Sequence, residues 1–241
     1  MKVKAFAKIN LTLKVFPKKE KRKLHKIKSI ITLVDDLYDT IEIKKSPDHL
    51  WHIETNIPEL NNEENYVSII ANFIRKDFDL NDDPIKLVLT KNIPIKSGLG
   101  GGSSDAMATI KLLDEFFKLN ISKSQKLKYA KMIGSDCFFF LENFKTALVT
   151  KYGNKIKRLK NISFVKRDLF FSNIKCDTKL VYESFDKNYN KQWRKFNNNL
   201  IIPCFKIYPE LEKEFNDLKT INKQISMTGS GSTFIKWPML K

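Results

Sequence analysis

The sequence "KSGLGGGSSDAM", Lys96–Met107, places four of the chain's eight glycines within five consecutive positions. Glycine loses more conformational freedom on folding than any other residue, and it has no side chain to pack. A cluster of this kind therefore indicates a backbone that turns sharply or closely approaches another group.

The segments on either side of the glycines show what this loop connects. "IKLVLTKNIP" before it predicts a strand that stops at Pro94, and apolar residues at helical spacing follow it from Ala106 to Phe117. We expect Ser103 or Ser104 to cap that helix. A glycine loop that opens a helix gathers free N–H groups and the positive end of the helix dipole, which is an anion site. The alternative is a flexible turn.

Three well-known phosphate loops do not match the stretch. A Walker A loop ends in Gly-Lys-Ser/Thr, and "GLGGGSSD" has no such lysine. The dinucleotide pattern fails at its last glycine, where Ser103 stands, and the chain contains no protein-kinase catalytic-loop motif. These three classes are excluded.

The overall composition is that of a basic globular protein. The chain has 241 residues, 42% of them hydrophobic, and a net charge of +17 from 44 basic and 27 acidic residues. The length allows one large domain or two ordinary ones. Only five basic residues are arginine, and Lys, Asn, Ile and Phe all have codons rich in A and T, so genome bias accounts for much of the charge. A surface that binds nucleic acid is the alternative.

The cysteines and the apolar runs indicate the compartment. Three widely spaced cysteines with no metal-ligand spacing predict reduced thiols in the core. No run approaches the ~18 apolar residues that a membrane span needs, and lysines interrupt the N-terminus. We expect a cytoplasmic protein that binds no membrane.

The first strand carries a polar face. Apolar residues alternate from Val3 to Val15, which places Lys8, Asn10 and Thr12 together on the opposite side. Ordinary solvent exposure is the simplest interpretation of that face. The basic run 17–26 predicts a loop, and 27–43 predicts two strands broken near Asp35 and Asp36.

The remaining segments alternate between helix and strand patterns. Residues 65–78 have apolar residues at helical spacing, and a further helix is predicted from about Gln125 to Ile133, ending at Gly134. Beyond Thr150, strand-like and helical pieces lead to a second small glycine turn, Gly229–Gly231.

Several motifs together resemble a known family. "IPIKSGLGGGSSDA" is similar to the phosphate loop of the GHMP kinases, and "AFAKINLTLKV", "LHKIKSIITLVDDLYDTIEI", "IGSDCFFFL" and "MTGSGST" resemble the branch that phosphorylates 4-diphosphocytidyl-2-C-methyl-D-erythritol. The resemblance implies an α+β, two-domain GHMP kinase fold with the active site between the domains. Residues 1–145 would form a nucleotide-binding domain that resembles a ribosomal-protein fold, and residues 146–241 a shortened α/β sandwich.

The resemblance also implies a catalytic pair, Lys8 and Asp136. In phosphoryl transfer from ATP, a base receives the hydroxyl proton and cations stabilise the departing charge. A cation within about 4–6 Å lowers a carboxyl pKa by about 1–3, so Lys8 would keep Asp136 ionised. On the residues alone, Asp136 could equally cap a helix and Lys8 could be a solvated lysine.

The family likewise implies two sets of binding residues. For ATP, with Mg2+, they are Asn65, Lys91, Pro94, Ile95, Lys96, Ser97, Gly98, Leu99, Gly100, Gly101, Gly102, Ser103 and Ser104, although Asn65 could be an ordinary helix N-cap. No carboxylate identifies itself as a magnesium ligand. For the small-molecule acceptor they are Asn10, His25, Thr178, Tyr182, Gly229, Ser230 and Gly231. Tyr182 could instead be a half-buried aromatic, and His25 a surface residue.

One departure from the family keeps alternatives open. Leu24 stands where the family carries a tyrosine beside His25, and losing a stacking aromatic costs about 1–3 kcal/mol in comparable nucleic-acid cases. We expect transfer of the ATP γ-phosphoryl group to the 2-hydroxyl of the cytidylated methylerythritol, by a monomer or homodimer that binds no nucleic acid. The alternatives are a GHMP kinase for another alcohol and a basic RNA-binding protein.

Overall fold

The computed structural model describes residues 1–18 and 24–236, and these residues form two compact units. Unit 1 comprises Met1–Ala7, Leu37–Ile93 and Gly101–Asn143; unit 2 comprises Lys8–Asp36, Pro94–Gly100 and Phe144–Lys241. Strands β1 (Lys2–Val15) and β2 (Ile27–Lys45) contribute residues to both units. The last passage of the chain from unit 1 to unit 2 falls between Asn143 and Phe144, while the domain boundary expected at 145/146 stays a prediction.

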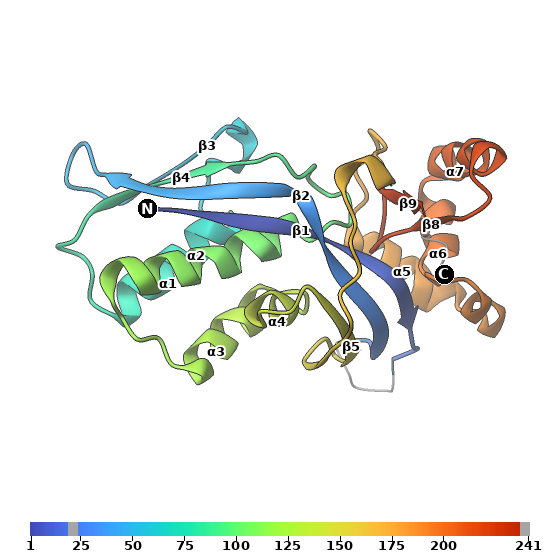
Figure 1. Cartoon of the computed structure of the whole chain (residues 1–241), viewed down its shortest axis with the longest axis horizontal. Helices are drawn as coiled ribbons and strands as arrows, with labels where there is room; N and C mark the ends of the chain where they lie inside the picture. The colour runs from blue at the N-terminus through green and yellow to red at the C-terminus, as the bar shows by residue number, and fades with distance from the viewer. Residues whose placement is uncertain (19–23, 237–241) are drawn as a thin grey trace. The chain divides into compact units, whose positions relative to one another are not determined.

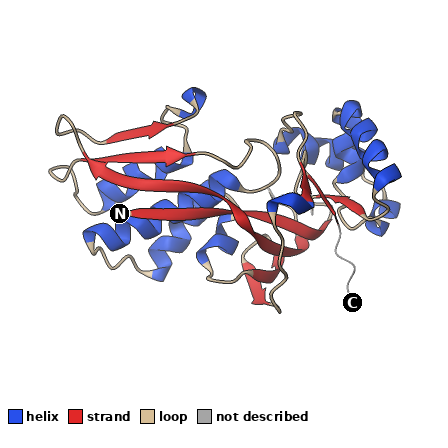
Figure 2. Ribbon diagram, turned by 45° about the horizontal axis from the view of Figure 1, so that its top comes forward, coloured by secondary structure: helices blue, strands red, loops and turns tan. Residues whose placement is uncertain are grey.

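Unit 1 is a sheet covered by helices (Figures 1 and 2). The second half of β2 pairs antiparallel with β4 (Ile85–Thr90), β4 pairs parallel with β3 (His52–Thr55), and β1 pairs with β2. Helices α1 (Tyr66–Asp77) and α2 (Gly101–Phe117) lie along one face of these strands. A short 3-10 helix (Pro58–Leu60), α3 (Lys123–Ile133) and α4 (Cys137–Leu141) complete the unit. The core of the unit forms where the apolar side chains of the strands and helices meet. Its buried residues include Ile41, Leu87, Leu89, Ile70, Ile74, Ile110 and Leu113.

Unit 2 combines two groups of strands with helices. The first half of β2 pairs antiparallel with β5 (Thr146–Lys151), which pairs with β6 (Lys155–Arg158). A three-stranded sheet has the order β7 (Leu169–Phe170), β9 (Phe234–Lys236), β8 (Ile225–Met227). The helices are α5 (Thr178–Asn188), α6 (Ile201–Ile207) and α7 (Pro209–Ile221), with 3-10 turns at Lys166–Asp168 and Lys191–Lys195. Leu13, Val15, Val181, Phe185, Leu211 and Phe234 belong to its core.

The expected break near Asp35 and Asp36 is wrong, because β2 is one continuous strand of 19 residues. Both carboxylates find partners in unit 2. Lys145 Nζ lies 2.6 Å from Asp35 Oδ1, and the Lys166 N–H donates to Asp36 Oδ1 over 2.6 Å. Polar side chains that are satisfied in this way do not oblige a strand to end.

The start of α2 also differs from expectation. The helix begins at Gly101, so Ser103 and Ser104 lie inside it and do not cap it. Other boundaries are confirmed. Helix α1 covers Tyr66–Asp77, and α3 ends before Gly134. A capping box between Ser122 and Gln125 marks the start of α3. The predicted loop 17–26 falls partly on residues 19–23, which lie outside the described residues. Within the described ranges, no helix is both long and apolar enough to cross a bilayer.

Candidate active site

The glycine loop joins β4 to α2, as the order strand, loop, helix predicts. Gly98 and Gly100 have φ of 78° and 69°, values that favour glycine, and Lys96 has 54°. A Cβ on Gly101 would lie 3.2 Å from Lys91 Nζ, and one on Gly102 would lie 3.1 Å from the Tyr66 ring. The first turn of a 17-residue helix therefore presents its N–H groups beside the Lys91 ammonium.

Part of the glycine requirement comes from packing inside unit 2. A Cβ on Gly98 would lie 2.6 Å from the Thr228 carbonyl oxygen, and one on Gly229 would lie 2.5 Å from the Gly98 carbonyl oxygen. The buried Asn198 amide donates to the carbonyls of Met227 and Gly229 and so fixes the second turn. The two glycine turns are thus in backbone contact, which no spacing in the sequence reveals.

Lys8 contacts the glycine loop across 90 residues of sequence. Its Nζ donates to the Gly98 carbonyl over 2.9 Å and to Asn10 Oδ1 over 2.7 Å, and its backbone N–H donates to the Leu99 carbonyl. Lys8 and Asn10 are each only 3% exposed, so ordinary solvent exposure of this face is wrong. The Asn10 amide in turn donates to Ser29 Oγ. Strand β1 therefore presents an ordered, buried ammonium to the loop.

Asp136 immediately precedes α4 in unit 1. Its side chain makes no cap hydrogen bond to that helix, which disfavours the capping interpretation. The next residue, Cys137, lies with its Sγ 3.8 Å from the Ser103 carbonyl oxygen, at the start of α2. Lys8 belongs to unit 2, so the meeting of the Lys8 and Asp136 side chains stays a prediction.

Lys91 is held between two carboxylates in unit 1. Its Nζ forms ion pairs with Asp39 and, at 2.6 Å, with Asp105. Burial alone would lower the pKa of Lys91, but the two carboxylates raise it above its usual value. Burial raises the pKa of Asp105 to about 7, although Lys91 acts in the opposite direction. Asp105 Oδ1 has no hydrogen-bond partner among the described residues.

Asn65 has a structural contact of its own. It is the N-cap of α1, where its Oδ1 accepts from the Val67 N–H and its Nδ2 donates to the Leu60 carbonyl. The capping interpretation is therefore confirmed. A contact with the nucleotide stays a prediction.

Four of the predicted acceptor residues lie on α5 or contact it in unit 2: Thr178, Tyr182, His25 and Ser230. Thr178 begins that helix, and its hydroxyl shares a 2.8 Å hydrogen bond with the Ser230 hydroxyl of the second glycine turn. The rings of Tyr182 and His25 have centroids 5.0 Å apart. His25 is 8% exposed, so it is not a surface residue. Its Nε2 lies 2.6 Å from Asp186 Oδ1.

Known proteins with similar sequences identify the family. The "GHMP kinases N terminal domain" matches residues 65–143. A 4-diphosphocytidyl-2-C-methyl-D-erythritol kinase from Ureaplasma parvum serovar 3 is 30% identical over 260 residues, covering 98% of this chain and 95% of the relative. The corresponding kinase from Caldanaerobacter subterraneus subsp. tengcongensis is 34% identical over 261 residues, covering 97% and 86%. The chain belongs to the 4-diphosphocytidyl-2-C-methyl-D-erythritol kinase family.

The fold agrees with this membership. The crystal structure of a 4-(cytidine 5'-diphospho)-2C-methyl-D-erythritol kinase superimposes with a TM-score of 0.75 at 23% identity, over 97% of this chain and 88% of that one. The expected GHMP kinase fold, a mixed α+β architecture, is confirmed. As a member of this kinase family, the chain is a small-molecule kinase with ATP as its co-substrate.

Three acidic residues in contact with the predicted site were missed in the sequence: Asp39, Asp105 and Asp186. Asp105 had a usable signal, because Asp105, Thr109 and Leu112 lie on one buried stripe of α2, and a charged residue on such a stripe requires a partner. Asp186 follows Thr178 and Tyr182 at intervals of four, which places all three on one face of α5. Asp39 is the Lys91 partner on β2, and nothing in its strand pattern singled it out.

The expected use of Mg2+ stays a prediction. Across the described ranges, no three His, Cys, Asp or Glu side chains gather as a metal site would require. Mg2+ commonly keeps several waters and binds through one or two carboxylates and substrate phosphates, so it does not require such a cluster.

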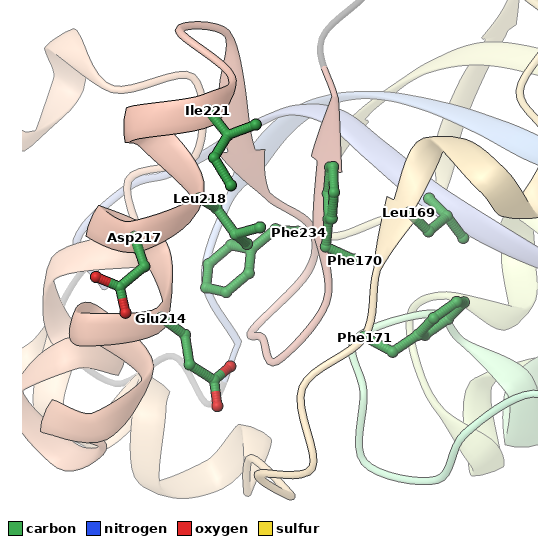
Figure 3. Close-up of a pocket in the computed structure, with 8 residues that line it drawn as sticks. All are labelled: Leu169, Phe170, Phe171, Glu214, Asp217, Leu218, Ile221 and Phe234. Carbon is green, nitrogen blue, oxygen red and sulfur yellow. The ribbon is translucent and has the colours of Figure 1, made fainter.

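A pocket of about 490 Å³ lies elsewhere in unit 2 (Figure 3). Aromatic and aliphatic side chains from β7, β9 and α7 line it together with two carboxylates of α7: Leu169, Phe170, Phe171, Glu214, Asp217, Leu218, Ile221 and Phe234. None of the residues predicted to contact ATP or the acceptor lines this pocket. We therefore assign it no part in the transfer.

Proposed function

We propose that this kinase transfers the γ-phosphoryl group of ATP to the 2-hydroxyl of 4-diphosphocytidyl-2-C-methyl-D-erythritol. Relatives that span almost the whole chain carry the name of that activity. The observation that carries the proposal is the hydrogen bond from Lys8 Nζ to the Gly98 carbonyl, because it orders an ammonium at the glycine loop. We expect a cytoplasmic enzyme, monomeric or homodimeric.

The nucleotide end of the site follows from the loop Pro94–Ser104. Its positive-φ glycines and the first turn of α2 offer N–H donors to phosphate oxygens. Lys91 lies against Gly101, and Tyr66, next to Asn65, lies against Gly102. We propose that Lys91, held by Asp39 and Asp105, and Asn65, as the cap of α1, keep this first turn in place beside ATP.

In the transfer, the 2-hydroxyl oxygen attacks the γ-phosphorus while the bond from that phosphorus to the bridging oxygen breaks, leaving ADP. We propose that Asp136 accepts the hydroxyl proton and that Lys8 stabilises the negative charge on the transferred group. Mg2+ supplies further neutralisation of the phosphate oxygens when bound. The Asn10 side chain holds Lys8 through its Oδ1, and Ser29 holds the Asn10 amide.

The acceptor end follows from unit 2. We propose that the cytidine diphosphate group of the acceptor lies along α5. Thr178 and the second glycine turn, Gly229–Gly231, would bind near the phosphates, while His25 and Tyr182 would bind the base. Asn10 would contact the base and would also orient the Lys8 ammonium. A base stacked on an aromatic ring gains about 1–3 kcal/mol, so Tyr182 can supply the surface that Leu24 does not.

An assay of ADP release tests the proposal directly. With ATP, Mg2+ and 4-diphosphocytidyl-2-C-methyl-D-erythritol, we expect ADP and the 2-phosphate product in equal amounts, and loss of turnover without Mg2+. Cytidine nucleotides should compete with the acceptor. A kinase for another alcohol would show no such competition. An RNA-binding protein would show RNA affinity that falls steeply with salt and no turnover.

A further inference from the structure

Asp186 on α5 connects two residues that come before and after residues 19–23. Its Oδ1 lies 2.6 Å from His25 Nε2, and its Oδ2 lies 2.9 Å from Lys18 Nζ. Each carboxylate oxygen therefore has a different partner. The three side chains come from distant parts of the sequence but all belong to unit 2.

The His25 ring is restrained on several sides. Tyr182 lies against it at 5.0 Å between centroids with a 49° tilt, and Phe185 meets it edge-on at 5.6 Å. Only 5% of the His25 side chain is exposed. Helix α5 thus supplies both the packing and the hydrogen bond that fix this imidazole.

The hydrogen bond also determines which ring nitrogen carries a proton. Burial alone would raise the pKa of Asp186, but the hydrogen bonds from Lys18 and His25 lower it below its usual value. An ionised carboxylate can only accept hydrogen bonds, so His25 Nε2 must donate. Nδ1 and the ring edge around it are then the parts of His25 that a ligand can use.

The same face of α5 reaches the second glycine turn. Thr178, Tyr182 and Asp186 are spaced four apart, so they follow one another along the helix surface over about 12 Å. Thr178 bonds to Ser230 at one end, and Asp186 bonds to His25 at the other. Under the proposed function, the base would lie at the His25 end of this stripe and the diphosphate towards Ser230.

We propose that Asp186 is a positioning residue of the acceptor site, which holds the His25 ring against Tyr182 so that the pair can receive the base of a cytidine diphosphate group. The proposal rests on the proposed function for the identity of that group. Asp186 acts through His25 and does not itself touch the acceptor. The bond to Lys18 is made by the other carboxylate oxygen, Oδ2, and does not involve the His25 ring.

The test measures the Kd for CDP by calorimetry, together with KM for the acceptor, KM for ATP and kcat. Asp186→Asn should raise the Kd for CDP and the acceptor KM about tenfold, because it weakens a charge-assisted hydrogen bond. KM for ATP and kcat should stay within about twofold. Glu183→Gln is the matched control, because it removes an exposed carboxylate from the same helix and should change none of these values.

A double-mutant cycle separates positioning from a general structural role. If Asp186 acts through His25, Asp186→Asn should cause no further loss of CDP affinity in a His25→Ala background. Lys18→Met should leave the CDP affinity within about twofold, and Asp186→Glu should restore part of the affinity that Asp186→Asn loses. If Asp186→Asn does not fold, Asp186→Glu provides a second variant, which keeps the carboxylate but moves it relative to His25.

Several results would overturn the inference. These are equal CDP affinity in the wild type and Asp186→Asn, additive losses in the cycle, or a Lys18→Met variant that reproduces the loss. A wild type that binds CDP but phosphorylates a different alcohol would instead contradict the proposed function, and the CDP affinities would still decide the role of Asp186. A wild type that binds no CDP would contradict both.

Discussion

The Lys8 ammonium is buried, and two oxygen atoms accept its hydrogen bonds. Burying an ammonium is costly unless oxygens receive its hydrogen bonds, and both the Gly98 carbonyl and Asn10 Oδ1 do so. The alternation in β1 predicted that Lys8 and Asn10 share a face. It could not predict the burial of that face, because the atoms that cover it come from residues 98, 99 and 228.

Replacing the Asp136 carboxylate by an amide should have the largest effect on turnover of any substitution considered for this chain. Asp136→Asn keeps the size of the side chain but removes the base, so kcat should fall by about 10²–10⁴-fold, as is typical of general-base loss. Steady-state release of ADP measures the change. The melting temperature should stay close to that of the wild type, and Asp217→Asn, an exposed carboxylate on α7, should keep full turnover. Unchanged turnover in Asp136→Asn would remove Asp136 from the mechanism.

Asp105 should make stability depend on pH. Its pKa is raised to about 7 in the folded chain against about 3.9 in an unfolded one, so the folded state binds the extra proton between these values. Folding stability from this group is therefore greatest below about pH 4 and is lost as the pH rises towards 7. Above pH 7, Asp105 carries its charge inside a buried cluster with Lys91 and Asp39.

Asp105→Asn imitates the protonated carboxyl and should remove this dependence. Relative to the wild type, the variant should gain stability as the pH rises from 5 to 8, by at most about 1.4 kcal/mol per pH unit. Urea unfolding at the two pH values measures the gain. Glu115→Gln, an exposed carboxylate on the same helix, should show a constant difference from the wild type. A stability difference from the wild type that stays constant with pH in Asp105→Asn would contradict a raised pKa of Asp105.

At the scale of elements, local patterns predicted the helices well and one strand poorly. The apolar stripe of α1 and the glycine after α3 are local signals, and both helices lie where they were expected. Two strands with a break near Asp35 and Asp36 were expected in place of the single strand β2, because adjacent acidic residues are unfavourable in a strand. Their partners, Lys145 and the Lys166 N–H, lie more than 100 residues away, beyond any local pattern.

The contact between the two glycine turns is the element-scale feature most open to test. Gly229 has a φ of 58°, and an added Cβ would lie 2.5 Å from the Gly98 carbonyl oxygen. Gly229→Ala should therefore destabilise the fold by about 1–3 kcal/mol and reduce turnover, because the loop that faces Lys8 must move. Chemical denaturation and the ADP assay measure the two effects.

Gly134→Ala is the matched control for that substitution. Gly134 follows α3, and a Cβ there would meet nothing within 4 Å. We expect this variant to unfold and to turn over as the wild type does. Equal behaviour of the two alanine variants would show that the second glycine turn tolerates displacement from Gly98.

At the scale of the whole molecule, the motifs predicted the family and its fold, but not how the chain is shared between the units. Motif resemblance is enough for the fold, since each motif carries its own local structure. The units are built from interleaved segments: unit 2 takes Lys8–Asp36 and Pro94–Gly100 from the N-terminal half. Interleaving depends on pairings such as Ile31 with Ala147, which composition and periodicity do not encode.

This interleaving predicts that residues 146–241 do not fold when they are expressed alone. That fragment lacks the first half of β2, the pairing partner of β5, and it lacks Leu13 and Val15 from the core that also contains Val181 and Phe185. Burial of such side chains contributes about 1.5–3 kcal/mol each, a large share of the stability of a small domain. We expect the amide NMR spectrum of the fragment to lack dispersion and its circular dichroism to show no cooperative thermal transition, whereas the full chain shows one. A cooperative transition in the fragment would mean that the C-terminal part is a domain in its own right, and that the segments it lacks add to its core without being needed for it.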